Sequence, residues 1–402
     1  MYLVSISQMR YNISRYFAYT EIQMKFIHLS DLHLGKRVNE FSMIEDQAYI
    51  LNQILEIIDK EAPDGVLIAG DVYDKSVPLA EAVRLFDDFL FALSTRSLKV
   101  FIVSGNHDSA ERLSFASRLI HKNGIYISPV YNGEILPTRM EDTFGAVNVY
   151  MLPFVKPSNV RRYFEEEEIG SYTDAIRVAI QGMKLNHNER NVLVAHQFVT
   201  GASRSDSEEI SVGGTDNVDA SVFADFDYVA LGHLHGPQNC GTDKIRYCGT
   251  PLKYSFSEAK HHKSVTVIEL EEKGKLSVRT VDLIPLRDLV EIKGKYNDLM
   301  LKSFYEHKSY DTDYVHVTLT DEEDIPDAIS KLRTVYKNLM KLDYDNTRTQ
   351  SRQDVDGATD VEEKSPHQLF AELFELQNNL PMSQEQGKLI DKLIEQIWEG
   401  DI

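Results

Sequence analysis

Aspartate, asparagine and histidine recur in five short motifs along this chain, and each motif offers side chains that can bind a divalent metal ion. The motifs are Asp31-Leu32-His33, Gly70-Asp71-Val72-Tyr73-Asp74, Gly105-Asn106-His107-Asp108, His196 after an apolar run, and Gly232-His233-Leu234-His235. Any one of them alone is more often a turn or a hydrogen-bonded core residue. All five together, each ending or following a predicted strand, indicate one site for two metal ions.

The chemistry expected of such a site is phosphoester cleavage, which needs an activated water, neutralised phosphate oxygens and a stabilised leaving oxygen. Two divalent ions about 3.5–4 Å apart can provide all three functions when one ligand bridges them. A carboxylate bridges well because it has two oxygens, and Asp71 is the candidate for this position. Imidazole and carboxylate ligands together suit Mn, Fe or Zn better than Ca or Mg.

The elements that must position these motifs are short apolar strands, which alternate with amphipathic helices from Met24 onward. We predict strands at 24–30, 65–69, 99–103, 125–128, 147–152, 191–196, 226–231, 245–248 and 264–270, and helices near 43–60, 79–94, 110–122, 158–164 and 172–186. This alternation is typical of a layered α/β fold with largely buried strands. Open α/β sheets usually place their sites at the carboxyl ends of strands.

The sequence changes in character near residue 280. Residues 281–342 are expected to form a small α+β unit of strand, helix, strand (314–319) and helix (about 326–341). Residues 343–364 are poor in aliphatic side chains and are predicted to be a linker. At the other end, residues 1–23 fit poorly with the rest of the chain, so we interpret them as a disordered leader or as sequence before the usual start at Met24.

Residues 365–402 are predicted to form two helices, each beginning with a capping-box pattern. These patterns are Ser365-Pro366-His367-Gln368 and Ser383-Gln384-Glu385-Gln386. Apolar pairs recur every four residues and give each helix one apolar stripe. The pairs are Leu369/Phe370, Leu373/Phe374, Leu389/Ile390, Leu393/Ile394 and Ile397/Trp398. The stripes alone fit packing within the chain as well as they fit partner binding, but the preceding acidic linker favours a partner.

Composition places the chain among ordinary soluble proteins of two or three domains, with 402 residues, 42% apolar and 26% charged. The sequence contains no run of about 18 apolar residues, so it predicts no membrane span. The formal charge of −20 argues at first against nucleic acid. Over half of this excess lies in residues 301–402, however, and bound cations would offset the metal-binding carboxylates. Local DNA binding therefore remains compatible with the charge, with a basic partner expected.

The two cysteines, and the histidines outside the five motifs, are interpreted as structural or solvent-exposed residues. Cys240 and Cys248 are expected to be reduced thiols in a cytoplasmic protein, with a disulfide between them as the alternative. His261 and His262, with Lys260 and Lys263, form a cationic cluster for which a solvated loop is favoured over a phosphate contact. No functional role is assigned to His28, His121, His187, His307, His316 and His367.

Longer stretches around the motifs resemble the calcineurin-type metallophosphoesterases, and more narrowly the D subunits of SbcCD nucleases, the bacterial members of the Mre-type repair nucleases. The narrower resemblance is strong over about 24–290 and looser beyond. It rests on residues 28–36 (HLSDLHLGK), 69–74 (AGDVYD), 103–108 (VSGNHD), 195–199 (AHQFV), 211–215 (SVGGT), 231–235 (LGHLH) and 247–252 (YCGTPL).

The resemblance implies two metal sites, with Mn the expected ion. One would be held by Asp31, His33, Asp71 and His235, and the other by Asp71, Asn106, His196 and His233. His107 would not be a ligand; it would face the scissile phosphate and protonate the leaving oxygen or stabilise the transition state, oriented by Asp108. Imidazole suits this task because it can donate a proton near neutral pH. Archaeal and eukaryotic relatives have histidine where this chain has Asp74, so no catalytic role is assigned to Asp74.

The resemblance also implies an organisation: a β-sandwich nuclease domain flanked by helices at 24–280, a capping domain at 281–342 that helps seat DNA, and a docking segment at 365–402. The docking segment would bind SbcC, an SMC-like ATPase, in a heterotetramer built on a homodimer of D subunits. The implied activity is Mn-dependent 3′–5′ exonuclease cleavage of duplex ends and endonuclease cleavage of hairpins or single strands. ATP use would belong to SbcC, since this chain lacks a Gly-x-x-x-x-Gly-Lys-Ser/Thr loop.

Two alternatives compete with the nuclease interpretation. A calcineurin-like phosphatase or cyclic-nucleotide phosphodiesterase would use the same ligands, but protein phosphatases of this fold are expected to show Gly-Asp-x-Val-Asp-Arg-Gly and Gly-Asn-His-Glu. This chain instead has Asp74-Lys75 and Asn106-His107-Asp108. The second alternative is an inactive scaffold for a DNA-repair ATPase, which the intact ligands at every position disfavour.

Overall fold

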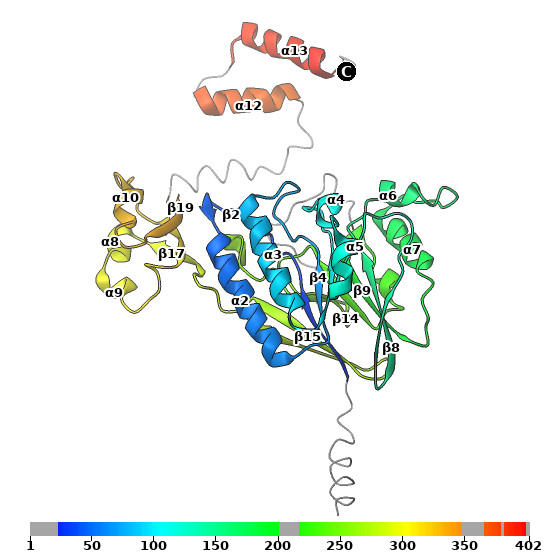
Figure 1. Cartoon of the computed structure of the whole chain (residues 1–402). Helices are drawn as coiled ribbons and strands as arrows, with labels where there is room; N and C mark the ends of the chain where they lie inside the picture. The colour runs from blue at the N-terminus through cyan, green and yellow to red at the C-terminus, as the bar shows by residue number, and fades with distance from the viewer. Residues whose placement is uncertain (1–22, 201–216, 347–365, 379–381, 399–402) are drawn as a thin grey trace, which may run out of the picture. The chain divides into compact units, whose positions relative to one another are not determined.

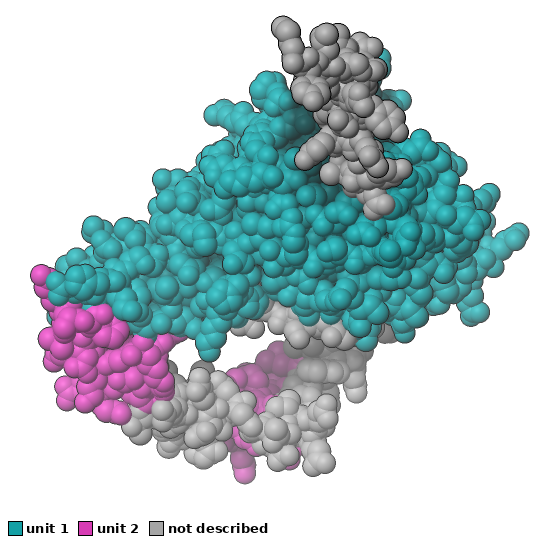
Figure 2. Space-filling view, turned by 90° about the horizontal axis from the view of Figure 1, so that it is seen from below, with its two compact units in different colours: residues 1–292, 305–317, 329–341 teal, residues 293–304, 318–328, 342–402 magenta. Residues whose placement is uncertain are grey.

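The computed structural model describes residues 23–200, 217–346, 366–378 and 382–398. The chain divides into two compact units, one of residues 1–292, 305–317 and 329–341, the other of 293–304, 318–328 and 342–402 (Figure 2). The predicted leader at 1–23, the linker at 343–364 and the quoted stretch 211–215 fall almost wholly outside the described residues. Among the residues that are described, no helix is long and apolar enough to cross a membrane.

Two six-stranded sheets form the centre of the first unit (Figure 1). The first sheet has the order β16-β15-β1-β4-β5-β6, from β16 (Leu276–Asp282), β15 (Ser264–Leu270), β1 (Met24–Leu29), β4 (Gly65–Ala69), β5 (Lys99–Val103) and β6 (Ile125–Ile127). The second has the order β13-β14-β12-β9-β8-β7, from β13 (Gln238–Cys240), β14 (Thr242–Tyr247), β12 (Tyr228–Gly232), β9 (Arg190–His196), β8 (Gly145–Leu152) and β7 (Thr138–Asp142). In each sheet four neighbouring strands are parallel, β1-β4-β5-β6 and β14-β12-β9-β8.

The two sheets pack face to face through one buried apolar cluster. Phe26, Leu67 and Phe101 of the first sheet meet Val192 and Tyr228 of the second, and all five are 0% exposed. Inner strands such as β4 and β9 are buried at every residue, which explains the continuous apolar runs in the sequence, because neither face of these strands meets solvent. The edge strands β7 and β16 keep exposed residues on one side. The predicted layered α/β sandwich is confirmed.

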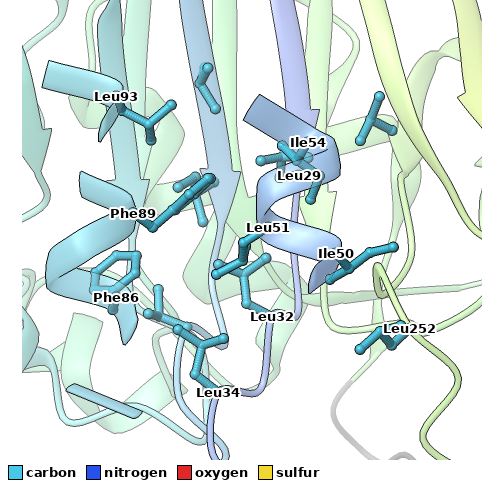
Figure 3. Packing of buried hydrophobic residues seen from close by; sticks show 14 of the residues in the cluster. Leu29, Leu32, Leu34, Ile50, Leu51, Ile54, Phe86, Phe89, Leu93 and Leu252 are labelled. Atoms are coloured by element: carbon cyan, nitrogen blue, oxygen red, sulfur yellow. The ribbon is translucent and has the colours of Figure 1, made fainter. Parts of the chain in front are cut away.

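Helices cover the outer face of each sheet. Helices α2 (Ile44–Glu61) and α3 (Ala80–Ser94) lie on the first sheet, and α6 (Pro157–Arg161) and α7 (Tyr172–Gly182) on the second. Figure 3 shows the first of these layers, where one side of each helix points at leucines that follow or end β1. The labelled residues are Leu29, Leu32, Leu34, Ile50, Leu51, Ile54, Phe86, Phe89, Leu93 and Leu252. The helical spacing of the apolar residues in α2 and α3 is what buries this side.

One predicted helix is wrong in its second half. The expected helix at 326–341 is the short α10 (Ala328–Leu332) followed by strand β19 (Asn338–Tyr344). Leu332, Tyr336 and Leu339 are all buried at a spacing that suits a helix, which is why the pattern misled. The backbone of β19 instead extends a three-stranded sheet of order β17-β18-β19, with β17 (Leu289–Gly294) and β18 (Tyr314–Leu319).

The remaining elements are short, apart from two helices near the end of the chain. The expected helix at 110–122 is broken into α4 (Ala110–Leu113), α5 (Ser117–Ile120) and the turn η1 (His121–Asn123). Ala116, which lies between α4 and α5, has a φ of +59°. The predicted pair at 365–402 is confirmed as α12 (Pro366–Asn378) and α13 (Gln384–Trp398). Others are β2 (Arg37–Val38), β3 (Phe41–Ser42), β10 (Phe198–Val199), β11 (Asn217–Val218), η2 (Ala220–Phe223), η3 (Phe256–Glu258), α8 (Tyr296–Leu299) and α9 (Lys302–Tyr305). Cys240 and Cys248 are buried free thiols, as predicted.

Candidate metal centre

Five strand ends from the two sheets bring the predicted ligands to one place. Asp31 and His33 follow β1, Asp71 follows β4, and Asn106 follows β5, all in the first sheet. His196 ends β9, and His233 and His235 follow β12, both in the second sheet. Because the parallel strands of each sheet end at a common edge, residues far apart in sequence become neighbours there.

The first group of donor atoms contains Asp31, His33 and His235. The Nε2 atoms of His33 and His235 face each other at 3.2 Å, and one carboxylate oxygen of Asp31 lies within 4.8 Å of both rings' ligand atoms. All three residues are at most 2% exposed. The buried Nδ1 of His33 has no hydrogen-bond partner in the described part of the chain. Two imidazoles and a carboxylate converging in this way are a ligand set for a borderline transition-metal ion.

The second group is built around the side-chain oxygen of Asn106. This Oδ1 lies 2.8 Å from Nε2 of His196 and 3.0 Å from Nδ1 of His233. The other ring nitrogen of His196, Nδ1, donates to the carbonyl of Ala69 at 2.9 Å, which leaves Nε2 as the atom that can bind a metal. A hydrogen bond from the far nitrogen is the usual way in which a ligating histidine is held in one tautomer.

Asp71 lies between the two groups. Its Oδ2 is 3.8 Å from Nε2 of His33 and 3.4 Å from Nε2 of His196, so one carboxylate oxygen borders both. Asp31 also forms a group of possible ligands with Asp71 and His196, within 4.8 Å of one another. The structure thus brings all seven predicted ligands together, and the donor chemistry fits two divalent ions that share Asp71.

His107 and Asp108 lie at the same place, but with different contacts from those expected. The Nδ1–H of His107 donates to the backbone carbonyl of Asp74 at 3.1 Å, and its Nε2 lies 4.0 Å from Oδ2 of Asp71. The Asp108 carboxylate instead accepts from the backbone N–H groups of Val72, Tyr73 and Gly105, at 2.9–3.1 Å. The expectation that Asp108 orients the His107 ring is therefore wrong.

Asp108 has a different structural task, which follows from those three contacts. Its carboxylate ties the loop after β4 to the loop after β5, and these loops carry Asp71 and Asn106. His107 also forms a group with His33 and Asp71 that could hold an ion. Its role as a proton donor and not a ligand therefore stays a prediction.

The backbone at the site is strained, as is common where function demands a fixed geometry. Four of the seven predicted ligands adopt positive φ angles that side chains rarely accept. They are Asp31 (52°), His33 (44°), Asp71 (48°) and His233 (112°). Each such residue costs about 1–3 kcal/mol, which the packed sheets on either side must offset.

Two motif glycines are required by close approach. At Gly70, with φ +87°, a Cβ atom would lie 2.3 Å from the His196 ring. At Gly232 a Cβ atom would lie 1.8 Å from the carbonyl oxygen of Ala69. The glycine that precedes Asp71, and the one that precedes His233, are therefore required because the two sheets approach each other closely at these positions.

Burial and mutual charge shift the ligands' pKa values in the metal-free chain. Burial works against a charged ring at His196, but the carboxylates of Asp71 and Asp31 outweigh it and raise its pKa to about 9. Burial, reinforced by the charge of Asp71, raises the pKa of Asp31 to about 6 against the pull of His196. Burial also holds the pKa of His33 well below its usual value, which keeps that ring neutral and able to bind a metal.

Sequence reasoning missed a buried group behind His235. Nδ1 of His235 lies 3.2 Å from Oε1 of Glu258, and the other oxygen of Glu258 pairs with Lys263. Burial opposes ionisation of Glu258, but the hydrogen bond with His235 and the charge of Lys263 outweigh it and lower the carboxyl pKa. Lys263 is 5% exposed, so the expected solvated loop is wrong at this position. The only signal in the sequence was an acid followed by a lysine five residues later.

Gln47 and Tyr254 were also missed, and both hold the loop that carries His33. The side-chain amide of Gln47 donates to the carbonyl of His33 at 2.7 Å, and the Tyr254 hydroxyl donates to the carbonyl of Leu32 at 2.6 Å. By contrast, His28 was predicted to have no role. It is buried in the core between the Tyr228 hydroxyl and the Leu231 carbonyl, as a satisfied core histidine should be.

Comparisons with known proteins agree with this geometry. A family model described as calcineurin-like phosphoesterase matches residues 24–237, and one described as the Type 5 capsule protein repressor C-terminal domain matches residues 285–378. The D subunit of the SbcCD nuclease of Staphylococcus epidermidis is 35% identical over 323 residues, covering 79% of this chain and 85% of that protein. Its counterpart in Staphylococcus saprophyticus is 35% identical over 324 residues, covering 79% and 84%.

Among solved structures, a dimetal phosphatase from Danio rerio covers 66% of this chain and 98% of its own, at 12% identity and a TM-score of 0.38. That score is too low to add to the assignment. The fold, the ligand set and the family model together define the chain as a calcineurin-like, metal-dependent phosphodiesterase. Within that class, the relatives place it in the family of SbcCD nuclease D subunits.

Proposed function

We propose that this chain is a Mn-dependent DNA nuclease subunit, with 3′–5′ exonuclease activity on duplex ends and endonuclease activity on hairpins or single strands. The observation that carries the proposal is the sharing of Asp71 between two groups of nitrogen and oxygen donors. The names of its relatives, which are nuclease subunits, supply the substrate class. DNA as substrate would place the chain at the nucleoid, in the cytoplasm.

When bound, the two ions would supply a low-pKa water and neutralise the scissile phosphate. The chain's own residues have separate tasks. Asp71 places one oxygen between the two donor groups, and the Ala69 carbonyl fixes the tautomer of His196. His107 is held at Nδ1 by the Asp74 carbonyl, so its Nε2 is the atom that can give a proton to the leaving oxygen.

A cavity beside the metal centre suits a nucleic acid strand. It has a volume of about 570 Å³, and the basic side chains of Arg37, Lys260 and Lys341 line it together with His316 and one acid, Glu291. Tyr254 also lines it, and the Tyr254 ring lies 5.8 Å from that of His33, measured between centroids. Because His316 and Lys341 come from residues 281–342, we propose that this segment seats DNA beside the site, as a capping domain.

The decisive assay uses the full chain, with and without an SbcC-type ATPase, on an end-labelled hairpin duplex in Mn and after chelation. We expect the chain to cleave the DNA only when Mn is present. We expect it not to hydrolyse the small monoester p-nitrophenyl phosphate. Lys260→Glu should weaken DNA binding without changing Mn binding. Efficient hydrolysis of small phosphoesters with no cleavage of DNA would reject the nuclease in favour of a phosphatase.

A homodimer of this chain is supported by exposed apolar residues around α3, α4 and α5. Phe91 and Phe115 are 71% and 82% exposed, and both line a hollow of about 400 Å³ together with Val83. Leu119 on α5 is 78% exposed. Apolar residues gathered in this way commonly mark a protein interface. Phe91→Ser with Phe115→Ser should convert a dimer to a monomer in light scattering, whereas a wild-type monomer at micromolar concentration would count against the dimer.

Docking on an SbcC-type ATPase is supported by the helix pair α12 and α13. His367 on α12 and Asp391 on α13 pair at 2.5 Å, and Phe370, Leu373, Leu389 and Leu393 remain 43–57% exposed. We propose that this helix pair binds the coiled-coil base of the ATPase. Leu389→Glu with Leu393→Glu should abolish co-purification with the ATPase and leave Mn binding intact, and unchanged co-purification would remove the docking role.

A further inference from the structure

The loop between β14 and β15 reaches the back of the metal ligand His235. Glu258, at the end of the turn η3, is 0% exposed, and its Oε1 lies 3.2 Å from Nδ1 of His235. The opposite ring atom, Nε2, is the one that faces His33 in the first donor group. A carboxylate that accepts from the far nitrogen of a ligand histidine fixes its tautomer and its ring orientation.

Lys263 completes this arrangement from the position just before β15. Its ammonium donates to Glu258, to Oγ1 of Thr250 at 2.7 Å and to the carbonyl of His235 at 2.9 Å. An ammonium has three N–H donors, so all three are used. The Glu258–Lys263 pair therefore holds His235 twice, by its ring and by its backbone.

A buried pair of this kind needs a reason beyond stability. Removing two charges from water costs several kcal/mol per ion, and apolar residues of similar volume are often equally or more stabilising. The ligand ring of His196, by comparison, has its far nitrogen held by the neutral backbone carbonyl of Ala69. The partner of His235 is a carboxylate, and a charged acceptor makes a stronger hydrogen bond.

We propose that Glu258 and Lys263 are positioning residues that preorganise His235 for one of the two metal ions. Glu258 accepts the Nδ1–H, which leaves Nε2 unprotonated toward the ion, and Lys263 fixes both the carboxylate and the His235 backbone. This inference rests on the proposed metal-dependent function and deepens it. It predicts unequal metal sites, because only the site that includes His235 depends on the pair.

The test is Mn binding to the full chain, measured by calorimetry and by electron paramagnetic resonance, which needs no cleavage. The variant Glu258→Gln with Lys263→Met removes both charges together, so neither is left buried alone. The affinity of one Mn should fall about 10–100-fold, the usual effect of losing such a partner, while the second Mn binds as in the wild type. The spectrum should change from a coupled pair to a single ion at limiting Mn.

A second buried pair provides the matched control. Arg190 and Asp142 are 2–3% exposed at their side chains and bond at 2.9 Å, and among the described residues neither side chain bonds to a predicted metal ligand. Arg190→Met with Asp142→Asn should leave both Mn affinities unchanged. Glu258→Asp keeps the charge beside Lys263 but withdraws the oxygen from His235, and it should weaken the same single site less strongly.

The outcomes separate the possible errors. If the wild type binds no Mn, the proposed function fails. If the wild type binds two ions and the Glu258 variants bind them equally well, the positioning role is overturned. It is also overturned if both sites weaken together with the unfolding midpoint of the metal-free protein, since that result indicates a merely structural pair. Should the double variant not fold, Glu258→Asp decides alone, and unchanged affinity rejects the inference.

Discussion

Replacing His107 by glutamine separates proton transfer from metal binding. The carbonyl of Asp74 can only accept, so Nδ1 of His107 carries the hydrogen and Nε2 is the atom free to exchange a proton. Glutamine keeps an N–H donor near that carbonyl but cannot transfer a proton at neutral pH. A general acid contributes about 10²–10⁴-fold, which corresponds to about 2.7–5.5 kcal/mol of transition-state stabilisation. We expect His107→Gln to lose cleavage of the labelled hairpin by this factor.

The same variant should keep both Mn ions and its affinity for DNA. His196→Gln is the matched comparison, because His196 lies 2.8 Å from Asn106 and 3.4 Å from Asp71 within the second donor group. That variant should lose metal and activity together. Asp74→Asn is the second control: since His107 bonds to the backbone of Asp74, the change of side chain should leave its orientation intact. If His107→Gln loses Mn as readily as His196→Gln, His107 is a ligand and our division of roles is wrong.

Three further changes test the ligands and the core. Asp71→Asn should abolish cleavage and lower Mn occupancy at both sites, measured by elemental analysis, because the shared oxygen loses its charge; full occupancy would refute the bridge. In the metal-free chain the pKa of His196 is raised to about 9, so its stabilising contribution is complete below pH 6.5 and lost as the pH rises through 9. Mn must displace that proton, so affinity should rise over this range, with proton release in calorimetry across buffers; pH-independent affinity would contradict the shift. Phe101→Ala, at a 0% exposed position stacked on Tyr126, should lower the free energy of unfolding in urea by about 3–5 kcal/mol, and a cost below about 1 kcal/mol would show that the sheets repack.

Much of the site could be predicted because its ligands lie next to strand ends. A buried strand such as β4 is visible as an apolar run, and the residue that comes after it must lie at the edge of the sheet. Asp71 was therefore placed correctly without knowledge of the other sheet. The direction in which a side chain points was harder to predict than the position of its residue in the fold. Asp108 is adjacent to His107, yet its side chain turns to the backbone of the neighbouring loop, and no local pattern specifies such a turn.

The residues that sequence reasoning missed act over long separations. Gln47 bonds to His33, 14 residues earlier in the chain, and Glu258 bonds to His235, 23 residues earlier and separated from it by β13 and β14. Neither stands in a motif, and helix or turn patterns are satisfied whether or not these contacts form. The helix predicted where β19 lies was wrong for a related reason. The apolar spacing of β19 suited a helix, and only the edge of a sheet formed by distant residues favoured the extended form.

The failures at the site itself result from its position in the fold. The ligands lie where the two sheets meet, and the strained backbone at Asp31, Asp71 and His233 is tolerated because the sheets pack on each other through a buried apolar cluster. The motifs encode the ligands and the turns that expose them. Which atoms converge depends on how the two sheets pack, and that packing is made by apolar residues such as Phe26 and Tyr228, which belong to none of the motifs. The donor types can therefore be read locally, whereas their convergence on Asp71 is a property of the whole sandwich.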